Sequence, residues 1–536
     1  MLLFTKTAKD AYVFKKSTKR YNDITIIYMK NQLKEPNSSK QEIYYDGDCP
    51  MCKVIIEQVQ TTKEGDESFN TNDFNHSILP LNITKEEVEK EIHVIDEKGV
   101  VFKNIDALIQ ILAVYPKYDF LVKIIKLPVI KQMFQIGYKF IALNRRFIFG
   151  EAKRIFWLKI VVILGLLSGL ALSLKLWVGD RFFSKVPFFG GVDFLTDGIQ
   201  IFLFTGLILS LFAVLIFPKP KRSLVISLCF LVLFLVNDQM RLQPWLYQYF
   251  FMLFGLSFFV LGSLKEEQTR SKILMSMRLL VASIYFFSGL QKLNLVFIRE
   301  VFPWMMEPLS HIINLDFGFL LIVFGMIVPF LEMGIGIGLL FPKFRKYAII
   351  FAFMMHSSIL FLLGPFGHNW NSVVWPWNIA MILFVFILFY KTEDFSFQSV
   401  FLVKNFFFHK IILLLFVIMP FFSFFNLWDS YLSSTLYSGN TNNAVIYIES
   451  SVKEKLPSKV AINTKKFSEG IYELDIFNWS FNELNVPPYP EKRIYLKIMK
   501  DLCKYSVSDN DIVLVIQGKP TVFFKDQAST YTCLSI

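Results

Sequence analysis

Two cysteines near the start of the chain have a spacing that suits thiol chemistry. Cys49 and Cys52 form a Cys-x-x-Cys pair in the stretch IYYDGDCPMCK. EIYY is typical of a strand, DGDCP of a turn and MCKVIIEQVQ of a helix, so we expect Cys49 at a helix N-terminus. Amide dipoles there favour the thiolate, which is the reactive form of cysteine. The pattern favours a reactive thiolate at Cys49.

Two other interpretations of the pair stay open. A structural zinc site normally takes four ligands from two such pairs. The other cysteines, Cys229, Cys503 and Cys533, fall in an apolar segment or, by the topology below, across the membrane. The pair could also be a structural remnant. We favour redox chemistry over both and expect no metal, and a structural disulfide between Cys503 and Cys533 is a further hypothesis.

Two ionisable residues lie deep inside apolar segments. Glu332 falls within FGFLLIVFGMIVPFLEMGIGIGLLF and His356 within AIIFAFMMHSSILFLLG. Such groups are costly in membrane spans and by default mark function. Both lie roughly 14 Å from the loop that joins their segments, at 1.5 Å per residue. Equal depth makes a Glu332–His356 pair possible, which would serve either proton handling or helix packing.

A second group of polar residues falls at the ends of apolar segments. Asp238, Arg241, Lys292 and His368 could share one extracytoplasmic rim. Lys292 itself has two interpretations, because a lysine with a route to water can snorkel, whereas one beside apolar walls can serve as a general base. From the residues alone, we favour snorkelling.

The elements that must position these residues are membrane helices. The chain has 536 residues, of which 54% are hydrophobic and 60 are Phe, and its mean hydropathy is +0.45. This excess is concentrated between about residues 155 and 426, which indicates an α-helical polytopic membrane protein. MLLFTK is too short an apolar stretch for a signal peptide, so none is expected.

We expect nine spans of about 17–25 residues each. Their expected bounds are 156–178, 198–217, 223–239, 244–263, 272–291, 316–341, 346–364, 374–390 and 410–426. Basic residues flank alternate loops, as in PKPKR and PKFRK, and short basic loops lie in the cytoplasm. The N-terminus is therefore expected in the cytoplasm and the C-terminal part outside, in an integral membrane protein.

Four parts follow from this division. They are a basic extension over 1–40, an α/β domain over 41–152, the membrane domain over 153–426 and a small α+β extracytoplasmic domain over 427–536. The last is expected to hold strands at 443–450, 511–520 and 521–526, and a helix that ends at Cys503. We attribute the net charge of +12 to topology and to attraction by anionic lipids. The expected partner is thus the lipid bilayer and not nucleic acid.

The N-terminal part resembles a known family. YYDGDCPMC, IHVIDEKGVVFKNIDALIQIL and YKFIALNRRFIFG resemble the DCC family of thiol–disulfide oxidoreductase-like domains. The resemblance implies a thioredoxin-like fold, with Cys49 as the attacking thiol and Cys52 as the resolving one. No proline occurs between Pro80 and Pro116, so the cis-proline of thioredoxins is missing. In the cytoplasm such a pair would rest reduced and act as an electron donor or sensor.

The apolar part resembles a second family. YFFSGLQKLNLVFIREVFPW, FLEMGIGIGLLF and MMHSSILFLLGPF resemble the horizontally transferred transmembrane (HTTM) family, which includes the vitamin K-dependent gamma-carboxylases. The resemblance implies that Lys292 is the base that starts hydroquinone oxygenation, and that Glu332 and His356 match an acid and a histidine of the carboxylases. It reverses the preference for snorkelling. One departure is Met240-Arg241, where the carboxylases have Asn-His.

Two functions of different class are therefore expected. The first is a gamma-carboxylase-like oxidoreductase of a bacterial inner membrane that uses a lipid quinone or hydroquinone. Its catalytic residues would be Cys49, Cys52, Lys292, Glu332 and His356, and its cofactor-binding residues Asp238, Arg241 and His368. The alternative is a non-redox membrane module that binds or matures a secreted peptide or protein, with the DCC domain in a regulatory role.

Overall fold

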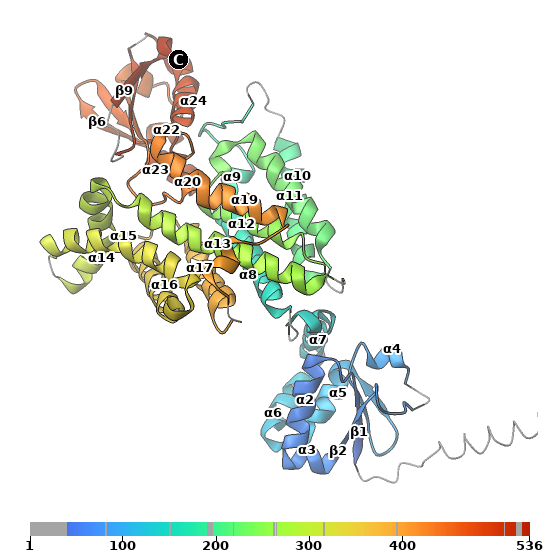
Figure 1. The fold of residues 1–536 in the computed structure, drawn as a ribbon. Coiled ribbons are helices and arrows are strands. Elements are labelled where there is room, and N and C mark those ends of the chain that lie inside the picture. Colours follow the sequence, from blue (N-terminus) through green and yellow to red (C-terminus); the bar gives the residue numbers. More distant parts are fainter. Residues whose placement is uncertain are drawn as a thin grey trace, which may run out of the picture. The chain divides into compact units, whose positions relative to one another are not determined.

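The computed structural model describes most of the chain after residue 39. The described residues are 40–80, 83–148, 152–189, 197–217, 219–260, 263, 265–314, 317–392, 395–508, 510–520 and 528–536. The chain divides into two compact units, Met1–Gly150 and Glu151–Ile536 (Figure 1). The predicted basic extension over 1–40 lies outside the described residues, except for Lys40. The division into four parts stays a prediction.

The first unit is an α/β domain, as the sequence predicts. Its mixed sheet has the order β2-β1-β3-β4, in which β1 is parallel to β2 and antiparallel to β3. The strands are β1 (Gln41–Tyr45), β2 (Phe69–Asp73), β3 (His93–Ile95) and β4 (Val101–Lys103). The helices are α2 (Pro50–Thr61), α3 (Lys63–Ser68), α4 (Lys85–Val88), α5 (Asn104–Ala113), α6 (Asp119–Ile125) and α7 (Pro128–Ile148).

The core of this unit lies on both faces of the sheet. Because side chains alternate along a strand, Ile43 and Tyr44 of β1 point to opposite faces. Ile43 packs with Ile56 of α2 and with α5, and Tyr44 packs with Phe74 and Val88 of the other layer. The two-sided burial holds β1 rigidly, and β1 leads directly into the turn that carries Cys49.

The second unit is a bundle of apolar helices followed by a small sheet. Its helices are α8 (Lys153–Leu172), α9 (Leu174–Trp177), α10 (Asp197–Ile216), α11 (Lys221–Asn237), α12 (Pro244–Leu256), α13 (Glu266–Gln291), α14 (Phe302–Ile313), α15 (Phe319–Leu340), α16 (Pro342–Leu363), α17 (Val374–Phe389), α18 (Phe397–Phe401), α19 (Phe407–Ile412) and α20 (Met419–Phe422). A π-helical stretch over Leu413–Ile418 joins α19 to α20. Each of the nine expected spans overlaps at least one helix of this list, and the ninth, over 410–426, overlaps α19, the π-helical stretch and α20.

Six of the described helices are long and apolar enough to cross a membrane. They are Lys153–Leu172, Gly198–Ile216, Glu266–Gln291, Phe319–Leu340, Pro342–Leu363 and Phe407–Phe425. The other three expected spans correspond to α11, α12 and α17, which have 17, 13 and 16 residues. The outward faces of the long helices are apolar, as Phe202 and Phe330 with 74% and 62% exposure illustrate. This is an integral membrane protein, but the predicted count of nine spans is not confirmed.

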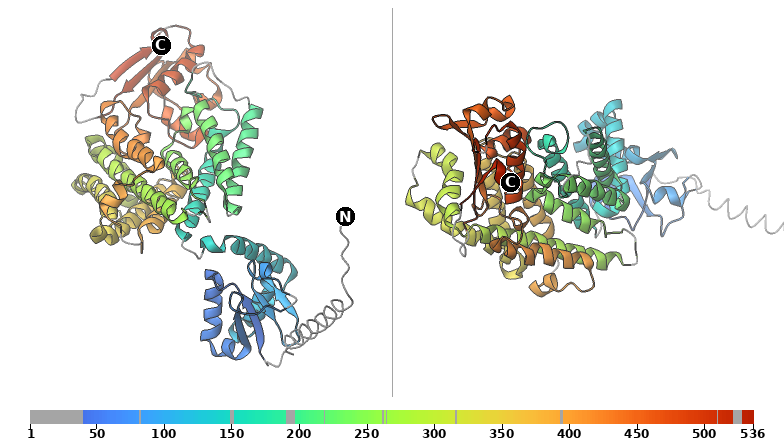
Figure 2. Two further views of the ribbon diagram at one scale, coloured as in Figure 1. Left: turned by 45° about the vertical axis from the view of Figure 1, so that its right-hand side comes forward. Right: turned by 90° about the horizontal axis from the view of Figure 1, so that it is seen from above.

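The C-terminal part forms a five-stranded antiparallel sheet at one end of the bundle (Figure 2). The strands are β5 (Asn443–Glu449), β6 (Thr464–Ser468), β7 (Ile471–Leu474), β8 (Ile512–Gln517) and β9 (Ala528–Thr532), in the order β6-β7-β5-β8-β9. The helices are α21 (Ser450–Lys453), α22 (Ser458–Ala461), α23 (Ile476–Leu484) and α24 (Lys492–Leu502). The predicted strands over 443–450 and 511–520 correspond to β5 and β8. The predicted strand over 521–526 lies outside the described residues.

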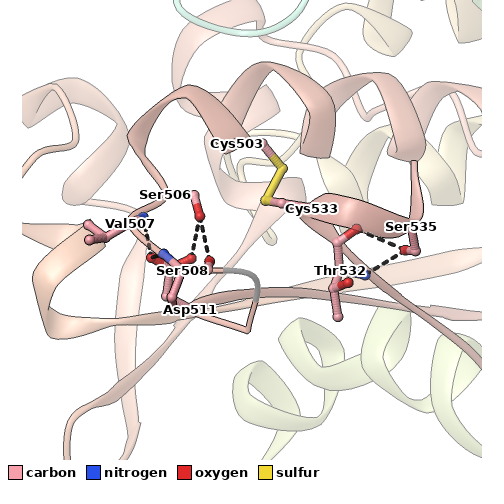
Figure 3. The surroundings of a disulfide bond; sticks show 8 residues. All are labelled: Cys503, Ser506, Val507, Ser508, Asp511, Thr532, Cys533 and Ser535. Atoms are coloured by element: carbon pink, nitrogen blue, oxygen red, sulfur yellow. Dashed lines mark hydrogen bonds between the residues drawn. A yellow bond between two sulfur atoms is a disulfide. The ribbon is translucent and has the colours of Figure 1, made fainter.

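Polar contacts and a disulfide hold this part together. Glu483 of α23 accepts hydrogen bonds from the backbone N–H groups of Phe182 and Phe183, at 2.6 and 2.9 Å, and so ties the sheet domain to the bundle. Cys503 and Cys533 form the predicted disulfide, which joins the end of α24 to the chain after β9 (Figure 3).

A carboxylate organises the turn before β8. Ser506 and the N–H groups of Val507 and Ser508 donate hydrogen bonds to Asp511 (Figure 3). Burial opposes the charged form of this carboxyl, but the hydrogen bonds outweigh burial and lower the pKa of Asp511. The turn is therefore fixed by a charged acceptor.

We predict that replacing both Cys503 and Cys533 by Ser destabilises the second unit by about 2–4 kcal/mol, because the disulfide closes a loop in the unfolded chain. Thermal unfolding in detergent measures the loss. Cys229→Ser, at an exposed position of α11, serves as the control and should change stability by less than about 0.5 kcal/mol. Equal melting of the double variant and the wild-type chain would contradict the prediction.

Candidate functional site

A buried ion pair lies between α13 and α15. Lys292 follows the last residue of α13, and its Nζ lies 2.7 Å from Oε2 of Glu332 in α15. The two side chains are 8% and 6% exposed. The helices approach closely here, because a Cβ on Gly289 would lie 2.4 Å from the carbonyl oxygen of Pro329. Glycine at position 289 therefore brings the lysine within reach of the acid.

All three N–H donors of the Lys292 ammonium have acceptors. Besides Glu332, they are the hydroxyl oxygen of Ser288 at 2.7 Å and its carbonyl oxygen at 3.3 Å. The structure thus does not place Lys292 as a snorkelling residue. The pair therefore places an amine and a carboxylate in direct contact within an apolar wall.

His356 belongs to a second polar group in the same region. Its Nδ1 lies 2.7 Å from Oδ1 of Asn378 in α17, and its Nε2 lies 2.6 Å from the hydroxyl of Tyr285 in α13. The Asn378 amide donates to the carbonyl oxygen of Val374 at 2.8 Å, which orients Oδ1 toward the imidazole. A neutral His356 therefore donates from Nδ1 and accepts the Tyr285 hydroxyl at Nε2.

The anticipated Glu332–His356 pair is therefore wrong. In the structure α15 and α16 meet at Phe341, so Glu332 lies nine residues from this junction and His356 fifteen. Glu332 turns to Lys292, while both nitrogens of His356 are engaged by Tyr285 and Asn378. The equal depth expected from the sequence depended on a span that starts at residue 346, whereas α16 starts at Pro342.

Both polar groups line one cavity of about 410 Å³. The remainder of its wall is mainly apolar and comes from α13 to α17 and from the chain after the last membrane helix. Polar lining residues are Tyr285, Ser288, Lys292, Glu332, His356, Ser358, Asn378, Ser434 and Tyr437, and five methionines also line it, Met305, Met306, Met354, Met355 and Met381. An apolar chamber with a few convergent polar groups is typical of a small-molecule site.

Asp238 and Arg241 are absent from the described residues that line the cavity, and the rim expected for them with Lys292 and His368 stays a prediction. Asp238 accepts hydrogen bonds from Arg181 at 2.6 Å and from the N–H of Val186 at 3.1 Å. The Arg241 guanidinium donates to the carbonyl oxygens of Leu176, Trp177 and Phe234. These two residues fasten the chain after α8 to the end of α11.

His368 also lies outside the cavity lining. Its ring stacks on Trp304 at 4.4 Å between centroids, and its Nε2 lies 2.7 Å from the Trp304 carbonyl oxygen. Trp304 in turn stacks on Tyr437, which does line the cavity. His368 therefore contacts the cavity wall only indirectly, through Trp304 and Tyr437.

Three polar residues of the site, Tyr285, Ser288 and Asn378, were not predicted from the sequence. Tyr285 and Ser288 precede Lys292 by seven and four residues, a spacing that places all three on one helix face. This spacing was a usable signal. Asn378 is the one amide in the apolar run of α17, but the sequence does not identify its partner.

The thiol pair sits at the start of α2, as predicted. Cys49 is the N-cap residue, and its Sγ accepts a hydrogen bond from the N–H of Cys52 at 3.4 Å. A sulfur in this position faces the amide groups of the first helical turn, which favour negative charge. The structure therefore confirms that Cys49 lies at the N-terminus of the helix, and its role as the attacking thiol stays a prediction.

The turn before Cys49 is fixed by the Asp73 carboxylate and by a hydrogen bond within the backbone. Asp73, at the end of β2, accepts a hydrogen bond from the N–H of Gly47 at 3.0 Å. A Cβ on Gly47 would lie 1.9 Å from this carboxylate, so the turn requires glycine. The N–H of Cys49 donates to the carbonyl oxygen of Asp46 at 3.0 Å. The position of the sulfur is therefore set by backbone contacts.

Both cysteines carry buried thiols. Cys49 and Cys52 are 1% exposed and pack with Met51, and with the partly buried Tyr45 and Ile55. Burial, followed by the neighbouring groups Asp73 and Cys52, raises the pKa of the Tyr45 phenol. An incoming disulfide must therefore displace a cover that includes Met51 and Tyr45.

Comparison with known proteins assigns this part of the chain. Residues 43–151 match the model of the DCC1-like thiol-disulfide oxidoreductase family. The match indicates a redox thiol function for the DCC1-like domain and agrees with the resemblance noted from the sequence. No curated protein and no solved structure matches the chain at a significant level. The likeness of the membrane helices to the HTTM family stays a prediction.

The described residues offer no cluster of three or more His, Cys, Asp or Glu side chains that could hold a metal ion. The DCC1-like domain offers two thiols, and the cavity offers an amine, a carboxylate, an imidazole and phenols.

We predict that Lys292→Met and Glu332→Leu each lower the stability of the bundle by about 3–5 kcal/mol, because each leaves one buried charge without its partner. The double variant should be more stable than either single variant. Thermal unfolding of the three variants in detergent gives the coupling. Additive losses in the double variant would show that the two groups do not interact.

Proposed function

We propose that this chain is a membrane oxidoreductase with two chemical sites. The DCC1-like domain exchanges thiols with disulfides, and the cavity between α13 and α17 binds a lipid quinol in a gamma-carboxylase-like manner. The observation that carries the first part is the Cys49 sulfur at the N-cap of α2. The second part is supported by the buried Lys292–Glu332 pair in an apolar chamber.

Thiol exchange at this pair takes two displacements. The Cys49 thiolate attacks one sulfur of a substrate disulfide, forms a mixed disulfide and releases the other sulfur as a thiolate. Cys52, three residues on, then attacks the Cys49 sulfur, forms the Cys49–Cys52 disulfide and releases the reduced substrate. The chain supplies two electrons per cycle, so an external thiol reductant must restore the pair. In thioredoxin-like domains the same order of strand, helix and parallel strand carries such a pair.

The lining of the cavity fits a lipid quinol. An apolar wall rich in flexible methionine can hold a ring and an isoprenoid chain, and the two polar groups can each meet one ring oxygen. When bound, a hydroquinone would supply two electrons and two protons to an oxidant.

The residues of the chain would handle the protons. When a proton of the Lys292 ammonium passes to Glu332, the Lys292 Nζ becomes neutral. It can then accept a proton from a hydroxyl placed near it. Once charged again, Lys292 stabilises the negative oxygen that remains. Tyr285 and His356 form a hydrogen-bonded pair on the same wall and would orient the far side of the ring.

The cysteines at the two ends of the chain fit compartments on opposite sides of the membrane. Thiols at Cys49 and Cys52 fit the reducing cytoplasm, and the Cys503–Cys533 disulfide fits an oxidising compartment outside. Such an arrangement requires an odd number of spans, which the nine expected segments would give. The location we propose is a bacterial inner membrane.

We predict that Cys52→Ser accumulates a mixed disulfide at Cys49, because the resolving thiol is absent. Purified full-length chain is treated with oxidised glutathione, and the adduct is identified by mass spectrometry. Cys49→Ser should form no adduct at residue 52, and Cys229→Ser should behave as the wild-type chain. An equal yield of adduct in the Cys49→Ser and Cys52→Ser variants would remove Cys49 from the attacking role.

We also predict that detergent-purified wild-type chain carries an extractable quinone whose difference spectrum responds to a reductant. Lys292→Met/Glu332→Leu should lose it, because the polar group that meets one ring oxygen is gone, whereas Lys343→Met at an exposed site of α16 should retain it. Equal quinone content in all three proteins would contradict the proposed quinol site. A chain without quinone that still binds a secreted peptide would favour the alternative, a peptide-handling membrane module.

A further inference from the structure

One helix of the DCC1-like unit has an apolar face directed away from its own domain. The inward face of α7 is fixed by Tyr138, which is 5% exposed and accepts a hydrogen bond from the N–H of Ile92 at 3.3 Å. Lys131, on the same side, forms an ion pair with Asp106 of α5 at 2.7 Å. The rest of the helix circumference is therefore open to another surface.

That open face carries large apolar side chains. Ile136 and Met133 lie two and five residues from Tyr138, so at roughly 100° per residue they point to the opposite side of the helix. They are 70% and 67% exposed. Leu127, in the turn before α7, is 53% exposed, and Phe120 of α6 is 77% exposed. Helices of water-soluble domains normally place polar residues on this side.

Charge in this unit is separated in the same way. Residues 116–148 hold seven Lys and Arg against one Asp, a net charge of +6, whereas residues 40–115 hold seven against fifteen acidic residues, a net charge of −8. Lys123, Lys126 and Lys139 are exposed beside the apolar residues. The apolar and the basic side chains thus belong to the same two helices, and the remainder of the domain is acidic.

The length of the chain keeps the C-terminal end of α7 near the membrane. Five peptide steps separate Ile148, the end of α7, from Lys153, the start of α8, and they span at most about 18 Å. Since α8 is long and apolar enough to cross a bilayer, the end of α7 cannot lie far from its surface.

We propose that α6 and α7 dock the DCC1-like unit on the anionic lipid surface of the membrane. The apolar residues enter the headgroup region and the lysines meet lipid phosphates, as in interfacial amphipathic helices. The acidic remainder of the domain would be repelled by the same anionic lipids. This inference does not rest on the quinol site or on the thiol exchange.

The depth of a spin label tests the proposal in the full-length chain. Cys49, Cys52 and Cys229 are replaced by Ser, the Cys503–Cys533 disulfide is kept, and a nitroxide is attached to Ile136→Cys. The protein is placed in nanodiscs of phosphatidylglycerol and phosphatidylcholine. We expect the label to be accessible to oxygen and several-fold less accessible to a water-soluble nickel chelate than a label at Ile78→Cys, an exposed apolar position outside α6 and α7.

Two further preparations complete the experiment. Replacing Lys123, Lys126 and Lys139 by Gln, or using phosphatidylcholine alone, should raise the nickel accessibility at residue 136. A label at Met133→Cys should behave like the one at 136, which guards against a local effect of either substitution. Equal nickel accessibility at 136 and 78 would overturn the proposal. Protection of 136 from both oxygen and nickel would also overturn it, because the face would then be covered by protein.

Discussion

The Lys292–Glu332 ion pair is the constraint on which the membrane unit depends. Removing two charges from water is costly, and the cost is recovered only if each charge meets its partner with good geometry. The structure achieves this by the close approach of α13 and α15 at Gly289 and by two further acceptors from Ser288. A polar centre in an otherwise apolar wall thus requires a particular helix spacing, and that spacing also shapes the cavity.

The same end of α13 holds the C-terminal part in place. Gln291 donates to Ser423 at 2.7 Å and accepts from Asn440 at 2.6 Å, and Asn294 donates to the carbonyl oxygen of Ser438 at 2.8 Å. The chain between these contacts brings Ser434 and Tyr437 to the cavity wall. Residues on either side of Lys292 therefore attach the segment that lines the chamber. A displacement of this end of α13 would also displace that segment.

Local features of this fold could be predicted from the sequence, and long-range ones could not. The position of Cys49 follows from a strand, a turn and a helix within twenty residues, and the structure has all three. The partner of Glu332 depends on the rotation of α13 against α15, which apolar composition leaves undetermined because those helices are hydrophobic all round. The contacts of Asp238 and Arg241 could not be predicted, because the path of the chain after α8 has no sequence signal. The expected span over 223–239 has the same length as α11 and is displaced by two residues, whereas the one over 244–263 runs beyond the end of α12 at Leu256, because apolar residues continue after Leu256.

The two chemical sites use opposite ends of helices for opposite charges. Cys49 caps the N-terminus of α2, where exposed N–H groups favour a thiolate, and Lys292 caps the C-terminus of α13, where exposed carbonyl groups favour an ammonium. In each case the side chain is also buried, so fixed dipoles and not water would stabilise a charge on it. Fixed dipoles need no reorganisation when a proton or an electron pair moves, whereas water does. Helix ends held in place therefore suit both proposed reactions. The packing of β1 next to Cys49 and of α15 next to Lys292 holds these ends in place.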